Sequence, residues 1–153
     1  MKDIILLFKY REYRILGSRL ADFILTTLGK DVMLWKDLDM IVPVPLHKKR
    51  QTQRGFNQAQ VLAKALERRT GIRSIPKLLV KVRNVPPQTS LEGKARRKNI
   101  RGAFGIKKEK KVKDKTILLV DDVYTTGSTV EECARILKKA GAREVKVLTL
   151  AQA

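Results

Sequence analysis

The sequence predicts an α/β protein built as one domain, in which helices cover both faces of a central, mostly parallel sheet. Short apolar runs with strand character alternate along the chain with longer segments of helical periodicity, an order typical of parallel sheets. A chain of 153 residues suits one domain that buries roughly 68–70% of its unfolded surface. Hydrophobic residues at 43% and charged residues at 32% are typical of folded globular chains.

The first half of the chain contains two predicted helices and one predicted strand. Apolar residues at helical spacing predict a helix over residues 12–28, which Gly29 would end. Residues 40–45, MIVPVP, predict a buried strand that runs into a loop constrained by its two prolines. Residues 56–70 predict a second amphipathic helix, closed by Gly71.

The second half begins and ends with predicted strands and contains one long loop. The loop, residues 83–101, is nearly 20 residues long, and loops of that length are usually functional when they are ordered. The elements expected around it are strands over 78–82, 103–106, 116–121 and 145–150 and a helix over 130–140.

Targeting signals and cysteine chemistry narrow the class of protein. No apolar run approaches the roughly 18 residues that a membrane span requires. The opening residues MKDIILLFKYREYR return to charge too soon for a secretory signal, so we expect a cytoplasmic protein.

Cys133 is the only cysteine, which excludes an intrachain disulfide and a cysteine-based zinc site. Its helical neighbours predict a small buried side chain rather than a reactive thiol.

The charge is strongly positive and unevenly distributed. The chain carries 34 Lys and Arg against 15 Asp and Glu, a net charge of +19. Residues 94–115 hold eleven of the basic residues but only Glu109 and Asp114 among the acids. Such a protein is expected to attract polyanions. We expect the KKEKKVKDK portion to form a solvated hairpin or loop, with contact to nucleic acid as the alternative.

The most informative stretch is Ile117–Thr129, ILLVDDVYTTGST. Its apolar run delivers Asp121 and Asp122 to the edge of a parallel sheet where ligands bind. The residues after them form a turn into the next helix, where unpaired backbone N–H groups and hydroxyls favour an anion. Two carboxylates would repel an all-phosphate ligand, but they suit the hydroxyls of a sugar or help to place Mg²⁺. A ribose 5-phosphate matches both halves.

Competing interpretations of this stretch are weaker. An isolated acidic pair or an isolated TTG would be read as a strand end and a helix cap, but the combination is far more specific. Neither the G-x-x-x-x-G-K-[ST] nor the G-x-G-x-x-G nucleotide signature occurs in the chain.

The stretch resembles the phosphoribosyl pyrophosphate (PRPP) loop of type I phosphoribosyltransferases. Further segments resemble the ComF family of competence-related proteins (the ComFC/GntX type), and together they cover nearly the whole chain. Members of that family often carry an N-terminal four-cysteine zinc ribbon, which this sequence lacks. The segments are residues 39–50 (DMIVPVPLHKKR), 54–66 (RGFNQAQVLAKAL), Gln88, 96–104 (RRKNIRGAF) and 138–151 (KKAGAREVKVLTLA).

The resemblance implies a type I phosphoribosyltransferase-like fold over residues 1–153. Residues 1–38 would form a small N-terminal hood, and residues 39–153 would form the PRPP-binding core. Residues 83–101 correspond to the mobile loop that closes over the active site in such enzymes, and a merely flexible basic loop is the equal alternative.

The resemblance also implies roles for individual residues. Asp121 and Asp122 would be the catalytic pair on the ribose hydroxyls and would hold Mg²⁺, directly or through water. His47, the only histidine, is expected near phosphate or at the surface rather than as a general base. The 5-phosphate would be bound by Thr125, Thr126, Gly127, Ser128 and Thr129, the pyrophosphate by Leu46, His47, Lys48 and Arg50, and other cleft positions would be Arg54, Asn57, Gln58, Gln88, Arg97 and Asn99.

Two functions of different class follow from these expectations. The first is an enzyme that transfers phosphoribosyl to or from a nitrogen acceptor with Mg²⁺ and pyrophosphate. The second is a non-catalytic competence protein that binds PRPP or handles single-stranded DNA. Few aromatic residues, 5% of the chain, disfavour a version that stacks bases.

Overall fold

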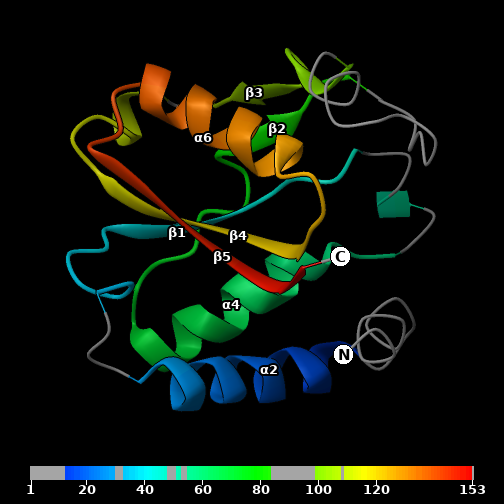
Figure 1. The fold of residues 1–153 in the computed structure, drawn as a ribbon, viewed down its shortest axis with the longest axis vertical. Helices are drawn as coiled ribbons and strands as arrows, with labels where there is room; N and C mark the ends of the chain where they lie inside the picture. Colours follow the sequence, from blue (N-terminus) through cyan, green and yellow to red (C-terminus); the bar gives the residue numbers. More distant parts are fainter. Residues whose placement is uncertain are drawn as a thin grey trace.

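The computed structural model describes residues 13–29, 33–47, 51–52, 55–83, 99–107 and 109–152. Three strands form the central sheet in the order β1–β4–β5, all parallel. They are β1 (Met40–Pro43), β4 (Thr116–Tyr124) and β5 (Glu144–Gln152). The prediction of an α/β fold with a parallel sheet and helices on both faces is confirmed (Figure 1).

The central strand is buried on both faces, which explains its continuous apolar run. Residues Ile117 to Val120 have no exposed surface, and alternate side chains enter two different cores. Ile117 and Leu119 pack with the helix α6 (Ser128–Lys139), whereas Leu118 and Val120 pack with α4 (Gln58–Thr70). The sheet therefore separates two hydrophobic cores.

The lower layer contains two helices. Helix α4 covers the sheet, and α2 (Tyr13–Leu28) packs on the outer side of α4 (Figure 1). Gly17 allows this contact, because a Cβ there would lie 2.5 Å from a methyl group of Val61. Residues 1–12 lie outside the described residues, so a hood over residues 1–38 stays a prediction.

The ends of α4 follow the chemistry of its sequence. The Asn57 side chain caps the first turn by accepting a hydrogen bond from the backbone N–H of Ala59 at 3.0 Å. Gly71 ends the helix with φ 75°, a left-handed conformation that glycine adopts readily. The observed helix begins two residues later than the predicted range 56–70 because Asn57 has extended backbone angles.

The upper layer combines α6 with a separate antiparallel pair, β2 (Leu79–Lys81) and β3 (Phe104–Ile106). Both strands were predicted, but they lie outside the parallel sheet. They pair with each other, which brings residues 82–83 close to residue 103. Between β3 and β4 the predicted hairpin or loop contains a short 3-10 helix, η1 (Glu109–Lys111).

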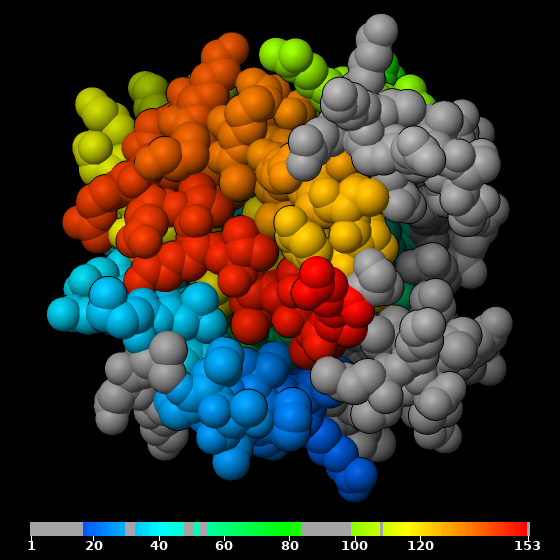
Figure 2. Space-filling model, viewed as in Figure 1, coloured from blue at the N-terminus to red at the C-terminus, as the bar shows by residue number. Residues whose placement is uncertain are grey.

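The C-terminal strand β5 crosses one face of the molecule between α6 and α2, as the space-filling view shows (Figure 2). It pairs with β4 along its whole length, from Glu144 to Gln152. This pairing carries β4 three residues beyond its predicted end, through Tyr124. Within the described residues, no helix is both long enough and apolar enough to cross a membrane.

Candidate functional site

The two adjacent carboxylates lie where β4 leaves the core. Val120 is fully buried, whereas Asp121 and Asp122 are partly exposed at the carboxyl end of the sheet. Each carboxylate accepts a hydrogen bond from the next backbone N–H, Asp121 Oδ1 from Asp122 at 2.9 Å and Asp122 Oδ1 from Val123 at 3.0 Å. In each carboxylate the second oxygen, Oδ2, takes part in neither of these two hydrogen bonds.

The surroundings of Asp121 shift its pKa. Burial, and secondarily the neighbouring charge of Asp122, raises the pKa of Asp121 well above its usual range. The ammonium of Lys81 opposes this effect and lowers the pKa of Asp121. Hydrogen-bond donors on a ligand would therefore stabilise the ionised form of the Asp121 carboxylate.

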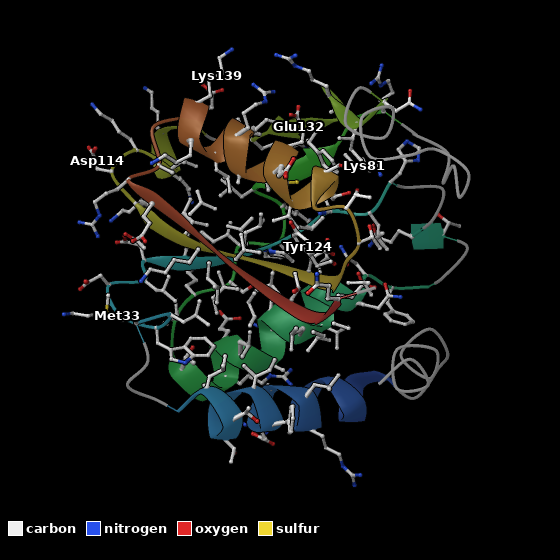
Figure 3. The ribbon with its side chains drawn as sticks, in the orientation of Figure 1. Met33, Lys81, Asp114, Tyr124, Glu132 and Lys139 are labelled. Atoms are coloured by element: carbon white, nitrogen blue, oxygen red, sulfur yellow. The ribbon has the colours of Figure 1, made fainter. Side chains whose placement is uncertain are left out.

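Lys81 is a residue that the sequence reasoning did not place in the site. It comes from β2, where it lies opposite Phe104, and its Nζ lies 5.3 Å from the centre of the Phe104 ring. Figure 3 shows Lys81 above the sheet on the side of α6, with Tyr124 at the end of β4. The only available signal was a basic residue inside an otherwise apolar strand.

The turn after β4 brings Gly127 into close contact with the Tyr124 side chain. Gly127 has φ 73°, and a Cβ there would collide with the ring and hydroxyl of Tyr124. As the N-cap of α6 it offers no side chain to the first turn, so the backbone N–H groups there lack a side-chain cap. The helix begins at Ser128, two residues before the predicted start. Thr126 Oγ1 and Ser128 Oγ are hydrogen-bonded at 2.9 Å.

A buried asparagine brings a second loop to the same edge. The Val44 N–H donates to the Val120 carbonyl at 2.8 Å, which continues the strand pairing beyond β1. Asn57 is 3% exposed and donates from Nδ2 to the Val44 carbonyl at 2.9 Å while it caps α4. Leu46 and His47, which follow Pro45 in the loop after β1, are partly exposed.

Gln58, the residue after Asn57, has an unusual environment. It is 2% exposed, and within the described residues its Nε2 is buried without a hydrogen-bond partner. Leaving a buried amide donor unpaired costs about 1–3 kcal/mol.

The structure also ties α6 to the base of the long loop. Glu132, one turn into α6, accepts a hydrogen bond from the Gly102 N–H at 2.8 Å and two from Arg135. At the start of the same loop, just after β2, the Arg83 guanidinium donates to the carbonyls of Asn99 and Arg101, both at 2.9 Å. Glu132 was not predicted because the sequence gives no reason to distinguish it from the preceding exposed Glu131.

The predicted site residues therefore fall into three groups. One group meets at the carboxyl edge of the sheet, and Asn99 lies instead at the base of the long loop. A third group lies outside the described residues. The edge group is Leu46, His47, Asn57, Gln58, Asp121, Asp122 and Thr125–Thr129, and the third group is Lys48, Arg50, Arg54, Gln88 and Arg97.

Among the described residues, two adjacent carboxylates at the sheet edge are the candidate ligands for a metal ion. Among the described residues there is no group of three or more His, Cys, Asp or Glu side chains that could hold a metal. Mg²⁺ is usually bound through one or two carboxylates together with water and substrate phosphates. Asp121 and Asp122 would suit that mode if a phosphorylated ligand supplied further oxygens.

Comparison with known proteins identifies the class. Residues 52–153 match the phosphoribosyl transferase domain, and the chain belongs to this family. The polypeptide folds in the same way as two larger structures. One is the allosteric regulatory enzyme of purine biosynthesis, with TM-score 0.58, 21% identity, and coverage of 89% of this chain and 25% of that one. The other is the B. subtilis glutamine PRPP amidotransferase, with TM-score 0.53, 22% identity and the same coverage.

Its homologues carry competence-related names, which confirms the resemblance to the ComF family. Competence protein F of Haemophilus influenzae is 39% identical over 116 residues, which is 75% of this chain and 51% of that protein. The DNA utilization protein YhgH of Escherichia coli K12 is 38% identical over 112 residues, 73% and 48% of the two chains. Competence protein ComFC of Streptococcus pneumoniae is 30% identical over 150 residues, 98% and 62%. The chain spans about half the length of the first two relatives.

Proposed function

We propose that the carboxyl edge of the sheet binds the phosphoribosyl group of PRPP. Asp121 and Asp122 accept hydrogen bonds from the ribose hydroxyls, and the turn at residues 125–129 binds the 5-phosphate. The observation that carries the proposal is that an acidic pair and a helix start without a side-chain cap, at Gly127, lie at one strand end. A ligand with a diol at one end and a phosphate at the other matches both features.

The pyrophosphate group is assigned to the loop that follows β1. Leu46 and His47 lie at the same sheet edge, held there through Asn57 and Val44. Lys48 and Arg50 follow in the sequence and would supply positive charge for the departing group. Their roles, and those of Arg54, Gln88, Arg97 and Asn99 as further cleft residues, rest on the family resemblance.

The high pKa of Asp121 gives ligand binding a proton signature. Ribose hydroxyls donate hydrogen bonds to the ionised carboxylate, and Mg²⁺ acts in the same direction, so binding lowers the pKa of Asp121. When PRPP binds at a pH near the ligand-free pKa, the protein therefore releases protons to the buffer.

The reaction proposed for this site is transfer of phosphoribosyl between pyrophosphate and a nitrogen acceptor. The bond from the anomeric carbon to the pyrophosphate oxygen breaks, the carbon–nitrogen bond forms, and the acceptor nitrogen loses its proton. Because negative charge develops on the leaving group, its neutralisation lowers the barrier most. Mg²⁺, held by Asp121 and Asp122 directly or through water, would add positive charge there. Exclusion of water protects the activated sugar from hydrolysis.

Calorimetric titration tests the binding proposal. PRPP, ribose 5-phosphate and pyrophosphate are titrated with and without Mg²⁺ into the wild type and the Asp121→Asn/Asp122→Asn variant. We expect PRPP to bind the wild type and to bind the variant at least tenfold more weakly. Asp114→Asn removes an acid at the opposite end of β4 and is the matched control. Equal affinity of the acidic-pair variant and the wild type would refute the assignment.

Turnover is tested separately by pyrophosphate release from PRPP and Mg²⁺ with a panel of nucleobases and amines. Release that depends on an acceptor and is lost in the Asp121→Asn/Asp122→Asn variant identifies an enzyme. Tight PRPP binding with no release for any acceptor identifies a protein that keeps the site for binding alone.

A second candidate function is the handling of single-stranded DNA during its uptake or use in the cytoplasm. The observation that favours it is that homologues are named Competence protein F and DNA utilization protein. The net charge of +19 is compatible with a polyanionic partner. Direct binding of a fluorescent single-stranded oligonucleotide tests it.

A further inference from the structure

Two exposed basic turns meet at the amino-terminal edge of the sheet, at the far end from the candidate site. The first, residues 109–115, leads into β4, and the second, residues 138–143, leads into β5. They interlock through hydrogen bonds from the Asp114 N–H to the Gly141 carbonyl at 2.8 Å and from the Arg143 N–H to the Lys115 carbonyl at 2.9 Å. Seven basic residues of the two turns are exposed, and one of them, Lys115, is paired with Asp39. We call the other six the basic edge: Lys110, Lys111, Lys113, Lys138, Lys139 and Arg143.

The charge of four of these residues is not cancelled locally. Within the described part of the chain, no hydrogen bond or ion pair involves the side chains of Lys110, Lys111, Lys113 and Lys139. Several other basic side chains are paired with acids: Lys115 of the first turn with Asp39, and, elsewhere in the described chain, Arg69 with Asp22 and Arg135 with Glu132.

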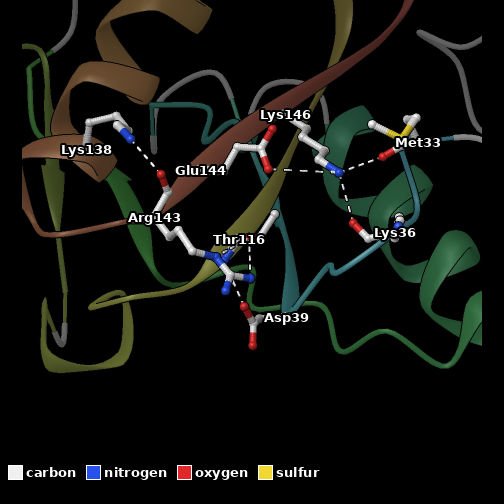
Figure 4. A network of polar contacts seen from close by, with 8 residues as sticks. All are labelled: Met33, Lys36, Asp39, Thr116, Lys138, Arg143, Glu144 and Lys146. Atoms are coloured by element: carbon white, nitrogen blue, oxygen red, sulfur yellow. Dashed lines mark hydrogen bonds and ion pairs between the residues drawn. The ribbon is translucent and has the colours of Figure 1, made fainter.

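The other two basic residues bind oxygens that carry no charge. Lys138 Nζ donates to the Arg143 carbonyl at 2.7 Å, and the Arg143 guanidinium donates to Thr116 Oγ1 (Figure 4). Arg143 also lies close enough to Asp39 to contribute to the lowered pKa of that acid. The acids inside the two turns are Glu109 and Asp114, so a strong positive excess remains.

The shape and composition of the basic edge fit an extended polyanion. Its ammonium groups are spread over two turns rather than converging on one point, so they match a series of phosphates better than one small anion. Neither turn contains an aromatic residue on which bases could stack. The exposed large hydrophobic residues of the described chain, such as Phe23 and Met33, lie outside these turns, so an apolar anchor for a membrane is missing there.

We infer that the basic edge binds the phosphodiester backbone of single-stranded nucleic acid without reading its sequence. This inference gives the second candidate function a surface and does not depend on the phosphoribosyl site. The two sites lie at opposite ends of β4, whose nine residues span about 26 Å at about 3.3 Å per residue. Figure 3 shows this separation between Asp114 and Tyr124. Both ligands are therefore expected to bind at once.

The test measures binding of a fluorescent oligo-dT of about 20 nucleotides over a salt series, because phosphate contacts give a log–log slope of about −0.7 each. The test variant replaces Lys110, Lys111, Lys113 and Lys139 with Gln. Loss of four contacts should make the slope shallower by about 3. Between about 50 and 200 mM salt, the affinity of the wild type should then fall about 50-fold more than that of the variant.

The matched control removes four positive charges elsewhere, by replacing Arg19, Lys64, Arg68 and Lys77 with Gln. Lys64 and Arg68 line a cavity of about 650 Å³ along α4, which is the competing surface for a nucleic acid. We expect this variant to keep a slope within one unit of the wild type. Circular dichroism and thermal unfolding establish that both variants are folded. If both variants lose affinity equally, or if the control loses more, the inference is wrong.

Competition and alternative partners complete the experiment. Saturating PRPP with Mg²⁺ should leave oligonucleotide affinity unchanged, and displacement of the oligonucleotide would place it at the phosphoribosyl site and overturn the inference. Binding to anionic vesicles without binding to the oligonucleotide would overturn it as well. PRPP affinity of the basic-edge variant is measured by calorimetry, so a failure of the phosphoribosyl proposal is recognised independently of a failure of this one.

Discussion

Replacing Asp121 with Asn should stabilise the ligand-free protein while it weakens PRPP binding. The carboxylate of Asp121 is poorly solvated and lies next to that of Asp122, and both effects raise its pKa. An asparagine keeps the Oδ1 that accepts the Asp122 N–H at 2.9 Å, so the substitution removes the charge without removing the hydrogen bond. Stability and ligand binding are therefore expected to change in opposite directions.

The size of the gain follows from simple electrostatics. At an effective dielectric constant of about 20, two like unit charges about 4 Å apart repel each other by about 4 kcal/mol, and the repulsion falls as their separation increases. The favourable interaction of Asp121 with Lys81 is lost at the same time and offsets part of this gain. We expect a net increase of about 1–2 kcal/mol in the free energy of unfolding, because removal of an unfavourable charge stabilises a protein by this order. The melting temperature should rise by about 2–8 °C.

The effect should depend on pH with a defined sign. Because the folded-state pKa of Asp121 is raised, the cost of its ionisation is absent below the unfolded value, about 3.9. The cost grows as the pH rises through the folded-state pKa. The advantage of Asp121→Asn should thus be larger at neutral pH than at acidic pH, and it should disappear below the unfolded-state pKa.

Urea unfolding of the wild type and the variant at neutral and acidic pH measures this difference. Asp39→Asn is the control of opposite sign, because hydrogen bonds from Lys115 and from the Thr116 N–H lower the pKa of Asp39. That variant should lose about 1 kcal/mol at neutral pH, a loss that fades as the pH falls through the folded-state pKa. If Asp121→Asn destabilises the protein at neutral pH, Asp121 is a structural residue and the reasoning for the site fails.

Three other substitutions test the elements that shape the site. Gly127→Ala should abolish detectable PRPP binding in calorimetry and cost about 1–2 kcal/mol in urea unfolding, because φ is 73° and the new methyl group collides with Tyr124. Unchanged binding would contradict a close approach of phosphate. Glu132→Ala should cost about 2–4 kcal/mol at neutral pH, since it leaves the Gly102 N–H without its acceptor. Because the pKa of Glu132 is lowered, the difference should shrink in acid, and a change below about 0.5 kcal/mol would refute this assignment. Asn57→Ala should cost about 1–3 kcal/mol by removing a helix cap, with weaker pyrophosphate binding, whereas an Asn57→Asp variant should keep the cap and recover part of the stability.

The helices and strands could be predicted from the sequence because the residues that determine them are close together in the chain. The run at residues 117–120 is apolar throughout because both faces of the strand are buried, and such a run has one interpretation in a parallel sheet. Gly71 ends α4 through its own backbone angles. The Asp121–Thr129 stretch is local in the same sense, since a strand end and the following helix start are neighbours in sequence.

The rest depends on contacts between distant residues, which no local pattern encodes. Lys81 acts on Asp121, 40 positions away, and Glu132 binds Gly102 across 30 positions. The alternation of helices and strands predicted one sheet, but β2 and β3 pair with each other outside it. An alternating order alone does not specify which strand becomes the neighbour of which, and that choice is made by packing.

The distribution of charge connects the two ends of the molecule physically. With 34 basic residues against 15 acidic ones, most acids are expected to serve as partners of a lysine or arginine. Asp121 and Asp122 lie next to each other instead, and burial disfavours the charge of Asp121 still further. A protein of strongly positive potential lowers the cost of keeping both carboxylates ionised and at the same time attracts polyphosphate ligands from a distance. The excess positive charge therefore favours the ionised form of the acidic pair, and it also strengthens the attraction of polyanions to the basic edge. It follows that neutralising the basic edge should leave PRPP affinity at high salt unchanged while it slows PRPP association at low salt, where the long-range field is least screened.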